Sequence, residues 1–374
     1  MKIRILHFLG RGNIGGQEKA TYELLKSFIN DSDIEFGVAI GQHNTFYEKK
    51  IRDLKVPIVE LNLNSGFSFK FNKTLLNELK EYNIHHFHDP TPNVILLSLL
   101  SGSKIRRAFT RRGGFHDYKK NGIKVRLKYF INKLLIRNLF HGYSGNTIHA
   151  TEFVRHFYNI RSKNIHVLYN GILFERLVPT VRPSDILDNL NLTNTEFKIG
   201  TACHLIDCKR VDLIIRSFCN SNINKKKLVI IGKGEDEYKL RKLAADLKID
   251  KQVIFAGEVS NIADYLQILD CFILASGKEE SFGNAVVEAM YLKRPSIIMN
   301  DSNGLKEHII DNQTGFIAKD EKDIVNKIEY VFNNPEVSKK IAETASLYVS
   351  NKYSISNMKN SYKKYYLDIL NGKN

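Results

Sequence analysis

Residues 270–290 read DCFILASGKEESFGNAVVEAM, an apolar run, a short polar loop and an amphipathic run. The pattern predicts a buried strand, a turn and then a helix capped by Ser281, because serine is a preferred N-cap residue. Two carboxylates stand eight positions apart in this stretch. Glu280 falls in the loop and Glu288 lies one to two turns inside the helix, so carboxylates flank both sides of the turn.

The start of this helix is a candidate anion site. Phe282, Gly283 and Asn284 are predicted to form the first helical turn, with their N–H groups pointing out of the helix start. The helix dipole favours anions there, such as a diphosphate, and Gly283 lets the anion approach the backbone closely. A capped helix with incidental surface glutamates explains the cap, but it does not explain two glutamates that flank a glycine.

The rest of the chain shows the same alternation of strand-like and helix-like runs. In the first half, strands are predicted at 2–9, 34–40, 56–62, 84–90, 105–110 and 142–151, and helices at 18–29 and 71–82. In the second half, strands are predicted at 197–205, 226–234, 252–259, 271–276, 294–301 and 314–320, and helices at 210–220, 237–249, 261–269 and 283–292. Such alternation indicates parallel, doubly wound sheets. An apolar run at 93–102 has the length of either a buried strand or a buried helix.

A proline-punctuated connection near 172–195 separates the two halves. We therefore predict an α/β fold with two Rossmann-like domains, residues 1–172 and residues 173–350, whose sheets face a central cleft. A last helical stretch within residues 351–374 is expected to pack back toward the first domain. Ligands bind at the carboxyl ends of the strands in such folds, so the cleft is the predicted site.

Basic residues are concentrated in the first half of the chain. The formal net charge is +16; residues 1–172 hold 27 Lys+Arg against 13 Asp+Glu, and residues 101–150 alone hold 12 against 1. A local patch of this kind should meet something anionic, such as phospholipid headgroups, a phosphorylated acceptor or nucleic acid. Nucleic-acid binding is disfavoured, because the sequence has no helix-turn-helix, zinc or RNP-like motif.

One amphipathic segment of this patch is suited to a membrane surface. Residues 124–140 are predicted to form a helix in which large apolar residues alternate with basic ones, namely Lys124, Arg126, Lys128, Lys133 and Arg137. Such a helix can lie on an anionic bilayer. The sequence has neither a signal-peptide core nor an apolar run of about 18 residues. We therefore expect a cytoplasmic protein that is peripheral at the inner face of the membrane.

The N-terminal glycines admit two interpretations. Gly10, Gly12 and Gly15 match the spacing of a dinucleotide-binding loop after a strand. That loop also requires an Asp or Glu at the end of the second strand to hold the ribose, and here that strand leads into Gly41. The helix is predicted to begin after Gly16, which also shifts the turn. We favour a glycine-lined turn whose backbone N–H groups face a ligand in the cleft.

The stretch ESFGNAVVEAM, residues 280–290, resembles the E-x7-E motif of the GT-B retaining glycosyltransferases of family 4, the glycosyltransferase 1 domain group. Further motifs are similar in order and spacing: GGQE at 15–18, YNGI at 169–172, HLIDCKRVDLIIRSF at 204–218, VIIGKGEDEYKL at 229–240, VIFAGEVSNIADYL at 253–266 and TGFI at 314–317. The resemblance covers essentially the whole chain, strongly after residue 165 and loosely before it. It implies the GT-B fold, in which two Rossmann-like domains face each other.

The resemblance implies a role for each matched residue. Glu280 would bind the donor sugar near its reacting carbon, Glu288 would accept both ribose hydroxyls of the nucleotide, and Lys209 would hold the donor diphosphate. Backbone N–H groups would assist at the diphosphate, from Phe282, Gly283 and Asn284 and from the Gly15-Gly16 turn. A cation and N–H groups can stabilise a leaving diphosphate without a metal, so neither a metal nor a cofactor is expected.

Three positions depart from the family pattern. The first basic residue of the family is His204 here, which makes that diphosphate ligand weaker or dependent on protonation. Arg210 replaces a family glycine, and it either supplies the missing charge or is a solvated arginine. Leu173 replaces the usual Asp of the N-G-[IV]-D motif, a change that removes a hinge or capping carboxylate but no chemical group.

The resemblance also bears on the first domain. The stretch FTRRGGFHD follows a strand where the family often places a histidine near the donor sugar, so His116 is the candidate, with Arg111 and Arg112 as contacts for an anionic acceptor. The histidines at 85–89 have no acidic or cysteine cluster with them, and a similar H-x-H strand end occurs in the family without a metal. Residues 31–33 resemble the D-x-D metal motif of the other glycosyltransferase fold, but we interpret them as a solvated turn.

Together these features predict a metal-independent hexosyltransferase. It would move a sugar from a UDP- or GDP-sugar to a hydroxyl of a glycan or lipid-linked acceptor, with retention at the anomeric carbon, in the synthesis of a cell-surface polysaccharide or glycolipid. Two alternatives stay open. One is a nucleotide-sugar epimerase with the same fold, and the other is a non-catalytic protein that binds anionic polymers.

Overall fold

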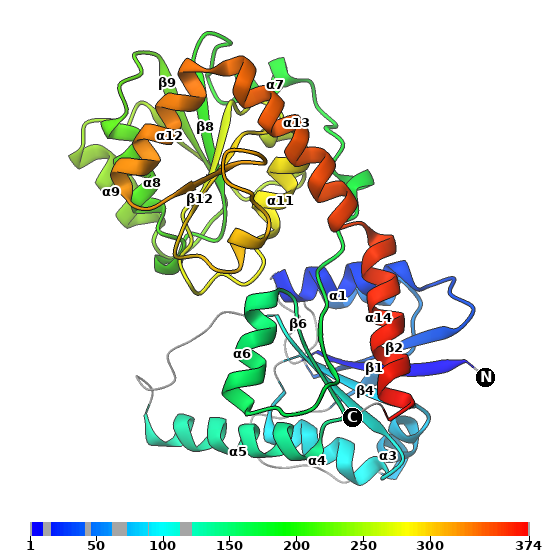
Figure 1. The fold of residues 1–374 in the computed structure, drawn as a ribbon. Coiled ribbons are helices and arrows are strands. Elements are labelled where there is room, and N and C mark those ends of the chain that lie inside the picture. Colours follow the sequence, from blue (N-terminus) through cyan, green and yellow to red (C-terminus); the bar gives the residue numbers. More distant parts are fainter. Residues whose placement is uncertain are drawn as a thin grey trace. The chain divides into compact units, whose positions relative to one another are not determined.

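The computed structural model describes residues 2–9, 16–41, 46–61, 73–88, 90–112 and 122–372. The chain divides into two compact units, which are best followed by colour in Figure 1. Unit 1 comprises the chain up to Ile172 together with the segment from Ile355 onward, and unit 2 comprises Leu173–Ser354. Unit 2 is therefore inserted between two parts of unit 1.

Unit 1 is built on a parallel sheet with the strand order β3-β2-β1-β4-β5-β6-β7. Its strands are β1 (Ile3–Leu9), β2 (Ile34–Ile40), β3 (Ile58–Glu60), β4 (Ile84–His88), β5 (Arg106–Arg111), β6 (Gly142–Gly145) and β7 (Ile165–Val167). Its helices are α1 (Gly16–Ser27), α2 (Phe46–Asp53), α3 (Lys73–Lys80), α4 (Pro92–Ser101), α5 (Ile123–Leu139), α6 (Ile148–Tyr158) and α14 (Ile355–Leu370). One apolar core lies between the sheet and α1 and α14, and a second lies between the sheet and α3 to α6.

Unit 2 has a second parallel sheet, with the order β10-β9-β8-β11-β12-β13. Its strands are β8 (Phe197–Ala202), β9 (Lys226–Ile231), β10 (Val253–Gly257), β11 (Cys271–Leu274), β12 (Ser296–Met299) and β13 (Phe316–Ala318). Its helices are α7 (Pro183–Asn189), α8 (Val211–Asn220), α9 (Glu237–Asp246), α10 (Ile262–Leu266), α11 (Asn284–Tyr291), α12 (Glu321–Asn333) and α13 (Pro335–Lys352), with short 3-10 turns η2 (Phe174–Arg176), η3 (Asp207–Lys209) and η4 (Leu305–Glu307). The prediction of two doubly wound parallel sheets is confirmed.

The strand predicted at 142–151 is wrong after Gly145. β6 ends there, and Thr147 caps α6 by accepting a hydrogen bond from the Ala150 N–H at 3.0 Å. A Cβ on Gly145 would lie 2.4 Å from the Thr151 nitrogen, so the helix can follow the strand this closely only because residue 145 is glycine. The apolar run at 93–102 forms the helix α4. Within the described residues, no helix has both the length and the apolar character needed to cross a bilayer.

Helix α14 supplies a buried face to unit 1. Met358, Tyr362, Tyr365, Tyr366 and Ile369 belong to the core under the sheet, and each is at most 3% exposed. Their spacing of four, three, one and three positions places them on one stripe of the helix. Burial of a large apolar side chain contributes about 1.5–3 kcal/mol, so unit 1 depends on this helix for much of its stability.

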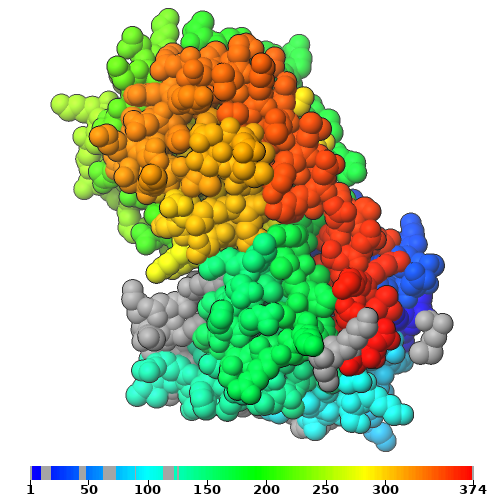
Figure 2. All heavy atoms as spheres, viewed as in Figure 1, coloured from blue at the N-terminus to red at the C-terminus, as the bar shows by residue number. Residues whose placement is uncertain are grey.

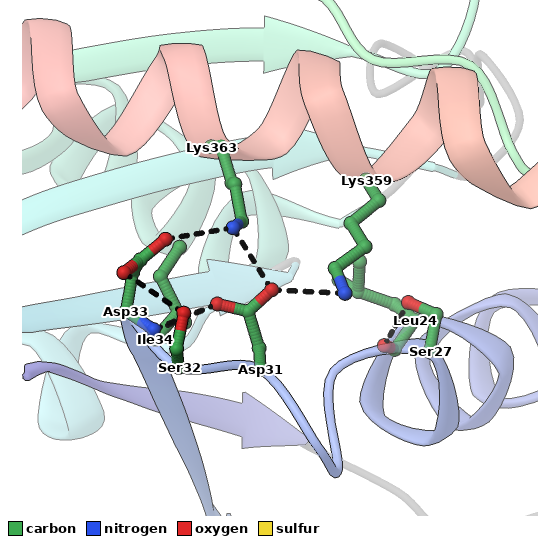
Figure 3. Close-up of polar contacts among 8 residues, drawn as sticks. All are labelled: Leu24, Ser27, Asp31, Ser32, Asp33, Ile34, Lys359 and Lys363. Atoms are coloured by element: carbon green, nitrogen blue, oxygen red, sulfur yellow. Dashed lines mark hydrogen bonds and ion pairs between the residues drawn. The ribbon is translucent and has the colours of Figure 1, made fainter.

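Asp31 fixes α14 to the loop before β2, as Figure 3 shows. Its Oδ2 lies 2.9 Å from the ammonium groups of both Lys359 and Lys363, and its Oδ1 accepts hydrogen bonds from the N–H groups of Asp33 and Ile34. Burial opposes ionisation, but the two lysines and the two N–H groups outweigh it and hold the pKa of Asp31 well below its usual range. The interpretation of this segment as a solvated turn is therefore wrong for Asp31, whose side chain is only 3% exposed.

Asp31→Asn should destabilise unit 1 by about 1 kcal/mol at pH 7, because the amide keeps an acceptor for the two N–H groups but loses both ion pairs, which water partly screens. A carboxyl with a depressed pKa in the folded state stabilises fully above its unfolded pKa of about 4 and loses that contribution as the pH falls toward the folded pKa. The difference from the wild type should therefore hold from pH 7 to about 5 and narrow below about 4. Urea unfolding followed by circular dichroism measures it.

Asp33→Asn is the matched control, because Asp33 also pairs with Lys363 but its side chain is 68% exposed. This variant should leave the unfolding midpoint close to that of the wild type at every pH. A difference between wild type and D31N that is absent at pH 7, or that does not narrow in acid, would contradict the anchoring role of Asp31.

Candidate active site

The switch point of the unit 2 sheet brings two predicted residues together. β8 and β11 are neighbouring strands although two other strands, β9 and β10, separate them in sequence. Lys209 ends η3, the turn that follows β8, and Glu280 lies in the loop that follows β11. The carboxyl ends of parallel strands meet at one edge of a sheet, so residues 71 positions apart become neighbours.

Lys209 and Glu280 form a part-buried ion pair. The Lys209 ammonium donates a hydrogen bond to Oε2 of Glu280, and the two side chains are 20% and 12% exposed. Burial opposes the charged form of the lysine, but the adjacent carboxylate outweighs it and raises the pKa of Lys209. Lys209 is therefore a cation at neutral pH. An anionic ligand at this point would compete with Glu280 for the ammonium and would free the carboxylate for a hydroxyl donor.

The loop before α11 turns on Gly283. The helix begins at Asn284, and Gly283 is its N-cap with a φ of +66°, a left-handed conformation that favours glycine. A Cβ there would also lie 2.3 Å from Cδ2 of Leu305. The prediction that Ser281 caps the helix is therefore wrong, and the N–H groups of Phe282 and Gly283 precede the helix. The helix start was predicted too early because the residue with the left-handed conformation is Gly283, and the helix begins only after it.

A histidine that sequence reasoning missed supports this loop. The Phe282 carbonyl lies 2.5 Å from Nε2 of His308, whose Nδ1 is 2.6 Å from the Tyr353 hydroxyl. A carbonyl only accepts, so Nε2 carries the proton and the Tyr353 hydroxyl donates to Nδ1. Burial lowers the pKa of His308 to about 3, so the ring is neutral. An isolated histidine between η4 and β13 matches no motif, which is why the sequence offers no signal for it.

Glu288 is buried in α11, and its partner Arg176 is a second residue that sequence reasoning missed. Arg176 in η2 donates a hydrogen bond to Oε1 of Glu288 at 2.6 Å; the glutamate side chain is 4% exposed and the arginine side chain 34%. A charge-assisted hydrogen bond of this length fixes the orientation of the carboxylate. The two residues are 112 positions apart, and no local pattern around Arg176 indicates the contact.

Arg210 is held in place rather than solvated. Its guanidinium forms two hydrogen bonds with the Asp301 carboxylate, of 3.0 and 2.8 Å, and a third with the Ala275 carbonyl at 2.7 Å. Its φ of +49° lies in the left-handed region, which explains why glycine suits this position in the family pattern. His204, another departure from that pattern, is exposed after β8.

The two arginines at the end of β5 are buried. Arg111 and Arg112 are each 6% exposed. Arg112 donates a hydrogen bond to Oδ1 of Asn170 at 2.8 Å and another to the hydroxyl of Tyr362, so it ties the end of β5 to α14. These two contacts give Arg112 a structural role, and the contact of Arg111 and Arg112 with an anionic acceptor stays a prediction.

Three histidines gather at the switch point of the unit 1 sheet. His7 on β1 and His86 and His88 on β4 are buried, and a ring nitrogen from each lies within 4.8 Å of the others. Burial lowers the pKa of all three, that of His7 to about 3, and the charge of Arg112 acts in the same direction. Both ring nitrogens of His86 already contact hydroxyl groups. A metal would have to displace those contacts beside a cation, so the cluster is better explained as a hydrogen-bond network.

Two of the predicted site residues, Gly15 and His116, lie outside the described residues. Gly16 is the first residue of α1, and Lys124 lies in the first turn of α5. The other two basic residues predicted for an acceptor or membrane, Arg126 and Lys128, are exposed on α5.

Two family models match the chain one after the other. Residues 14–176 match Glycosyltransferase Family 4, and residues 185–347 match Glycosyl transferases group 1. EpsD of Bacillus subtilis, whose name marks it as an unproven glycosyltransferase, is 26% identical over 305 residues, which cover 76% of this chain and 77% of EpsD. An uncharacterized glycosyltransferase of Methanocaldococcus jannaschii is 22% identical over 396 residues, which cover 99% of this chain and 100% of that protein.

A solved structure shares the fold. The crystal structure of Anabaena HepE in complex with UDP matches with a TM-score of 0.81 at 16% sequence identity, over 98% of this chain and 100% of HepE. Together with the two parallel sheets, this likeness confirms the predicted GT-B fold.

Substitutions of Arg210 should separate the backbone cost of its conformation from its ion pair. Arg210→Ala loses the Asp301 pair and keeps the left-handed strain, whereas Arg210→Gly loses both. A non-glycine residue in this conformation costs about 1 kcal/mol, and a part-exposed ion pair contributes about 0–1 kcal/mol. Unit 2 should therefore be about 1 kcal/mol less stable in R210A than in R210G, as measured by urea unfolding. Equal unfolding midpoints for the two variants would show that the conformation carries no strain.

Proposed function

This chain belongs to the group 1 glycosyltransferases of GT-B fold, and we propose that it transfers a sugar from a UDP- or GDP-sugar to a hydroxyl group with retention of anomeric configuration. The observation that carries this proposal is the Lys209–Glu280 pair at the switch point of unit 2, followed in α11 by the buried Glu288. HepE has been crystallised with UDP and with UDP-glucose, which supports a nucleotide sugar as the donor.

In this proposal the donor diphosphate takes the place of Glu280 at the Lys209 ammonium. The N–H of Asn284 at the start of α11 assists, because a helix N-terminus favours an anion. Glu280 then accepts a hydrogen bond from a hydroxyl of the donor sugar. Glu288, oriented by Arg176, accepts the ribose hydroxyls. No metal or cofactor takes part in this scheme.

The transfer proceeds in this scheme without a covalent intermediate between the sugar and the enzyme. The bond from the anomeric carbon to the donor phosphate oxygen breaks while the acceptor oxygen bonds to the same face of that carbon, so the configuration is retained. The departing phosphate oxygen takes the proton of the acceptor hydroxyl. Lys209 stabilises the negative charge that develops on the diphosphate, which is the main electrostatic demand of the step.

Helix α5 supports an acceptor at an anionic membrane surface. Ile136 on its inner side is buried, but a second apolar stripe on the helix is exposed. The stripe comprises Ile123, Leu127, Phe130 and Leu134, which are 82%, 56%, 58% and 41% exposed. At 3.6 residues per turn, the exposed basic residues Arg126 and Arg137 flank this stripe on one side. An apolar stripe beside cations fits an anionic bilayer.

Figure 2 shows the blue-green atoms of α5 at the surface of unit 1. We therefore propose a glycan or lipid-linked acceptor, used in the synthesis of a cell-surface polysaccharide or glycolipid, and a peripheral location at the inner face of the membrane.

The donor proposal can be tested by isothermal titration of the full chain with UDP, GDP, ADP and NAD. One nucleoside diphosphate, UDP or GDP, should bind, and Glu288→Ala should weaken its binding about tenfold or more, because a hydrogen bond to a charged group contributes roughly 1.5–3 kcal/mol. The control is Glu336→Ala, a change of the same type on the exposed face of α13, which should bind like the wild type. Binding of NAD alone would overturn the proposal.

Product analysis then separates a transferase from an epimerase. Incubation of the chain with the donor should yield a new glycoside only when a hydroxyl acceptor is present. Conversion of the donor into an isomeric nucleotide sugar without an acceptor would replace the transferase proposal. Lys209→Met should lower the transfer rate at least about a hundredfold, by the loss of charge stabilisation, whereas Lys242→Met on the exposed face of α9 should not.

Cosedimentation with lipid vesicles tests the membrane proposal. The chain should bind vesicles that contain phosphatidylglycerol more tightly than pure phosphatidylcholine, and added salt should weaken this binding. The double variant Leu127→Glu with Phe130→Glu should lose about tenfold or more in affinity, since it places two charges in the apolar stripe. Leu347→Glu, at a residue that is 67% exposed on α13, is the matched control. Equal binding by the double variant and the wild type would overturn the assignment of α5.

A further inference from the structure

The histidine cluster of unit 1 ends a chain of hydrogen bonds whose direction can be worked out. The chain starts at Ser144, whose hydroxyl lies 3.0 Å from the Phe109 carbonyl. A carbonyl can only accept, so Ser144 donates its single proton there. The hydroxyl of Thr110 is 2.6 Å from that of Ser144. We assign Thr110 as the donor in this second contact, because Ser144 gives its proton to the carbonyl.

The same argument passes along to His86. Nε2 of His86 lies 2.6 Å from the Thr110 hydroxyl oxygen, which can only accept because Thr110 has given its proton to Ser144. Nε2 of His86 therefore carries the proton, and in the neutral ring Nδ1 is an acceptor. The hydroxyl of Tyr366, on α14, lies 2.7 Å from that Nδ1 and donates to it.

From Tyr366 the chain continues to its end. The Tyr366 oxygen accepts from Nε2 of His7 at 3.3 Å, so Nδ1 of His7 is an acceptor. Nε2 of His88 lies 3.1 Å from that Nδ1 and must carry the donated proton. Nδ1 of His88 is then a bare lone pair. This atom is buried, and it has no hydrogen-bond partner among the residues that the structure describes.

A buried acceptor without a donor costs about 1–3 kcal/mol, so its persistence points to a ligand group that completes it. His88 is the last residue of β4 and stands beside Leu9, the last residue of β1, at the switch point of the sheet where α/β folds bind ligands. A lone pair there selects a hydroxyl or amide donor and rejects a phosphate or carboxylate oxygen, which can only accept. Burial, and after it the nearby charge of Arg112, holds the pKa of His88 well below its usual range.

We propose that Nδ1 of His88 accepts a hydrogen bond from a sugar hydroxyl of the substrate, and that Tyr366 is the positioning residue that holds His88 in this acceptor state through His7. The assignment of the ligand as a sugar rests on the proposed function, whereas the acceptor state of His88 does not. His88 contacts the substrate directly. Tyr366 acts on it from the last helix of the chain.

The acceptor state can be measured without any substrate. Long-range 15N–1H correlation spectra of the full chain, labelled with 15N-histidine, report which nitrogen of each ring carries the proton, and His88→Asn identifies the His88 signals. At pH 7 the wild type should show Nε2 protonated and Nδ1 bare in His88, His7 and His86. A protonated Nδ1 or a charged ring at His88 would overturn the proposal even if the chain is a glycosyltransferase.

Tyr366→Phe tests the relay, because it keeps the buried ring and removes the hydroxyl. His7 is then free to turn its proton toward His88, so the spectra should show mixed tautomers at both residues. The matched control is Tyr143→Phe, another buried tyrosine of unit 1, whose hydroxyl contacts the main-chain carbonyls of Ile136, Arg137 and Phe140. Tautomers unchanged in Y366F would exclude the role of Tyr366, and altered tautomers in Y143F would exclude a specific relay.

Kinetics test the sugar contact, with UDP-glucose as the first probe and any donor identified by titration in its place. His88→Phe should raise KM about two- to tenfold, the range of one neutral hydrogen bond, and His88→Asn should recover part of the loss because it keeps an acceptor. One of a series of monodeoxy donors or acceptors should be insensitive to H88F, since it lacks the hydroxyl in question. If H88F raises KM equally for every analogue, the sugar contact is excluded.

Discussion

The burial of the tyrosine face of α14 under the unit 1 sheet is the constraint on which the polar end of that sheet depends. Tyr362 accepts from Arg112, and Tyr366 contacts both His7 and His86. These groups lie in apolar surroundings, where losing one hydrogen-bond partner leaves another group unsatisfied at a cost of about 1–3 kcal/mol. The hydrophobic packing of the helix and the orientation of the ring nitrogens are therefore one property of the fold, since neither can change without the other.

In unit 2, by contrast, the charged side chains of the site are neutralised by ion pairs with one another. Lys209 is matched by Glu280, Glu288 by Arg176, and Arg210 by Asp301. Part-buried charges are costly unless they are paired, so the site is held together by its own ions before any ligand arrives. An incoming anion exchanges one partner for another, and the net electrostatic gain is small. Such a site selects among anionic ligands by how well their oxygens fit the positions of the paired groups, more than by total charge.

Local patterns were sufficient for most strands and for the turn that carries Glu280, because the apolar periods in unit 2 are sharp and its glycine turns are short. The boundary between β6 and α6 was missed because the predicted strand was continued through Gly145, Asn146 and Thr147, although Gly and Asn favour turns and Thr147 is the N-cap of α6. Distant contacts were missed for a different reason. Asp31 pairs with lysines of a helix more than 300 positions away, and the Arg176–Glu288 pair spans 112 positions. A period along the chain carries no information about such partners.

The insertion of unit 2 within unit 1 sets the order in which a ribosome can complete the two. The residues of unit 2 form one continuous segment, Leu173–Ser354, which takes roughly 10–40 s to translate at about 5–20 residues per second. Throughout that interval the unit 1 sheet has emerged without α14, so the face that the helix covers is open to solvent. Unit 2 can finish folding first, and unit 1, although its synthesis begins earlier, is completed only after α14 has followed unit 2 out of the ribosome. During synthesis, unit 1 is therefore the part of the chain that keeps an apolar face exposed to solvent for longer.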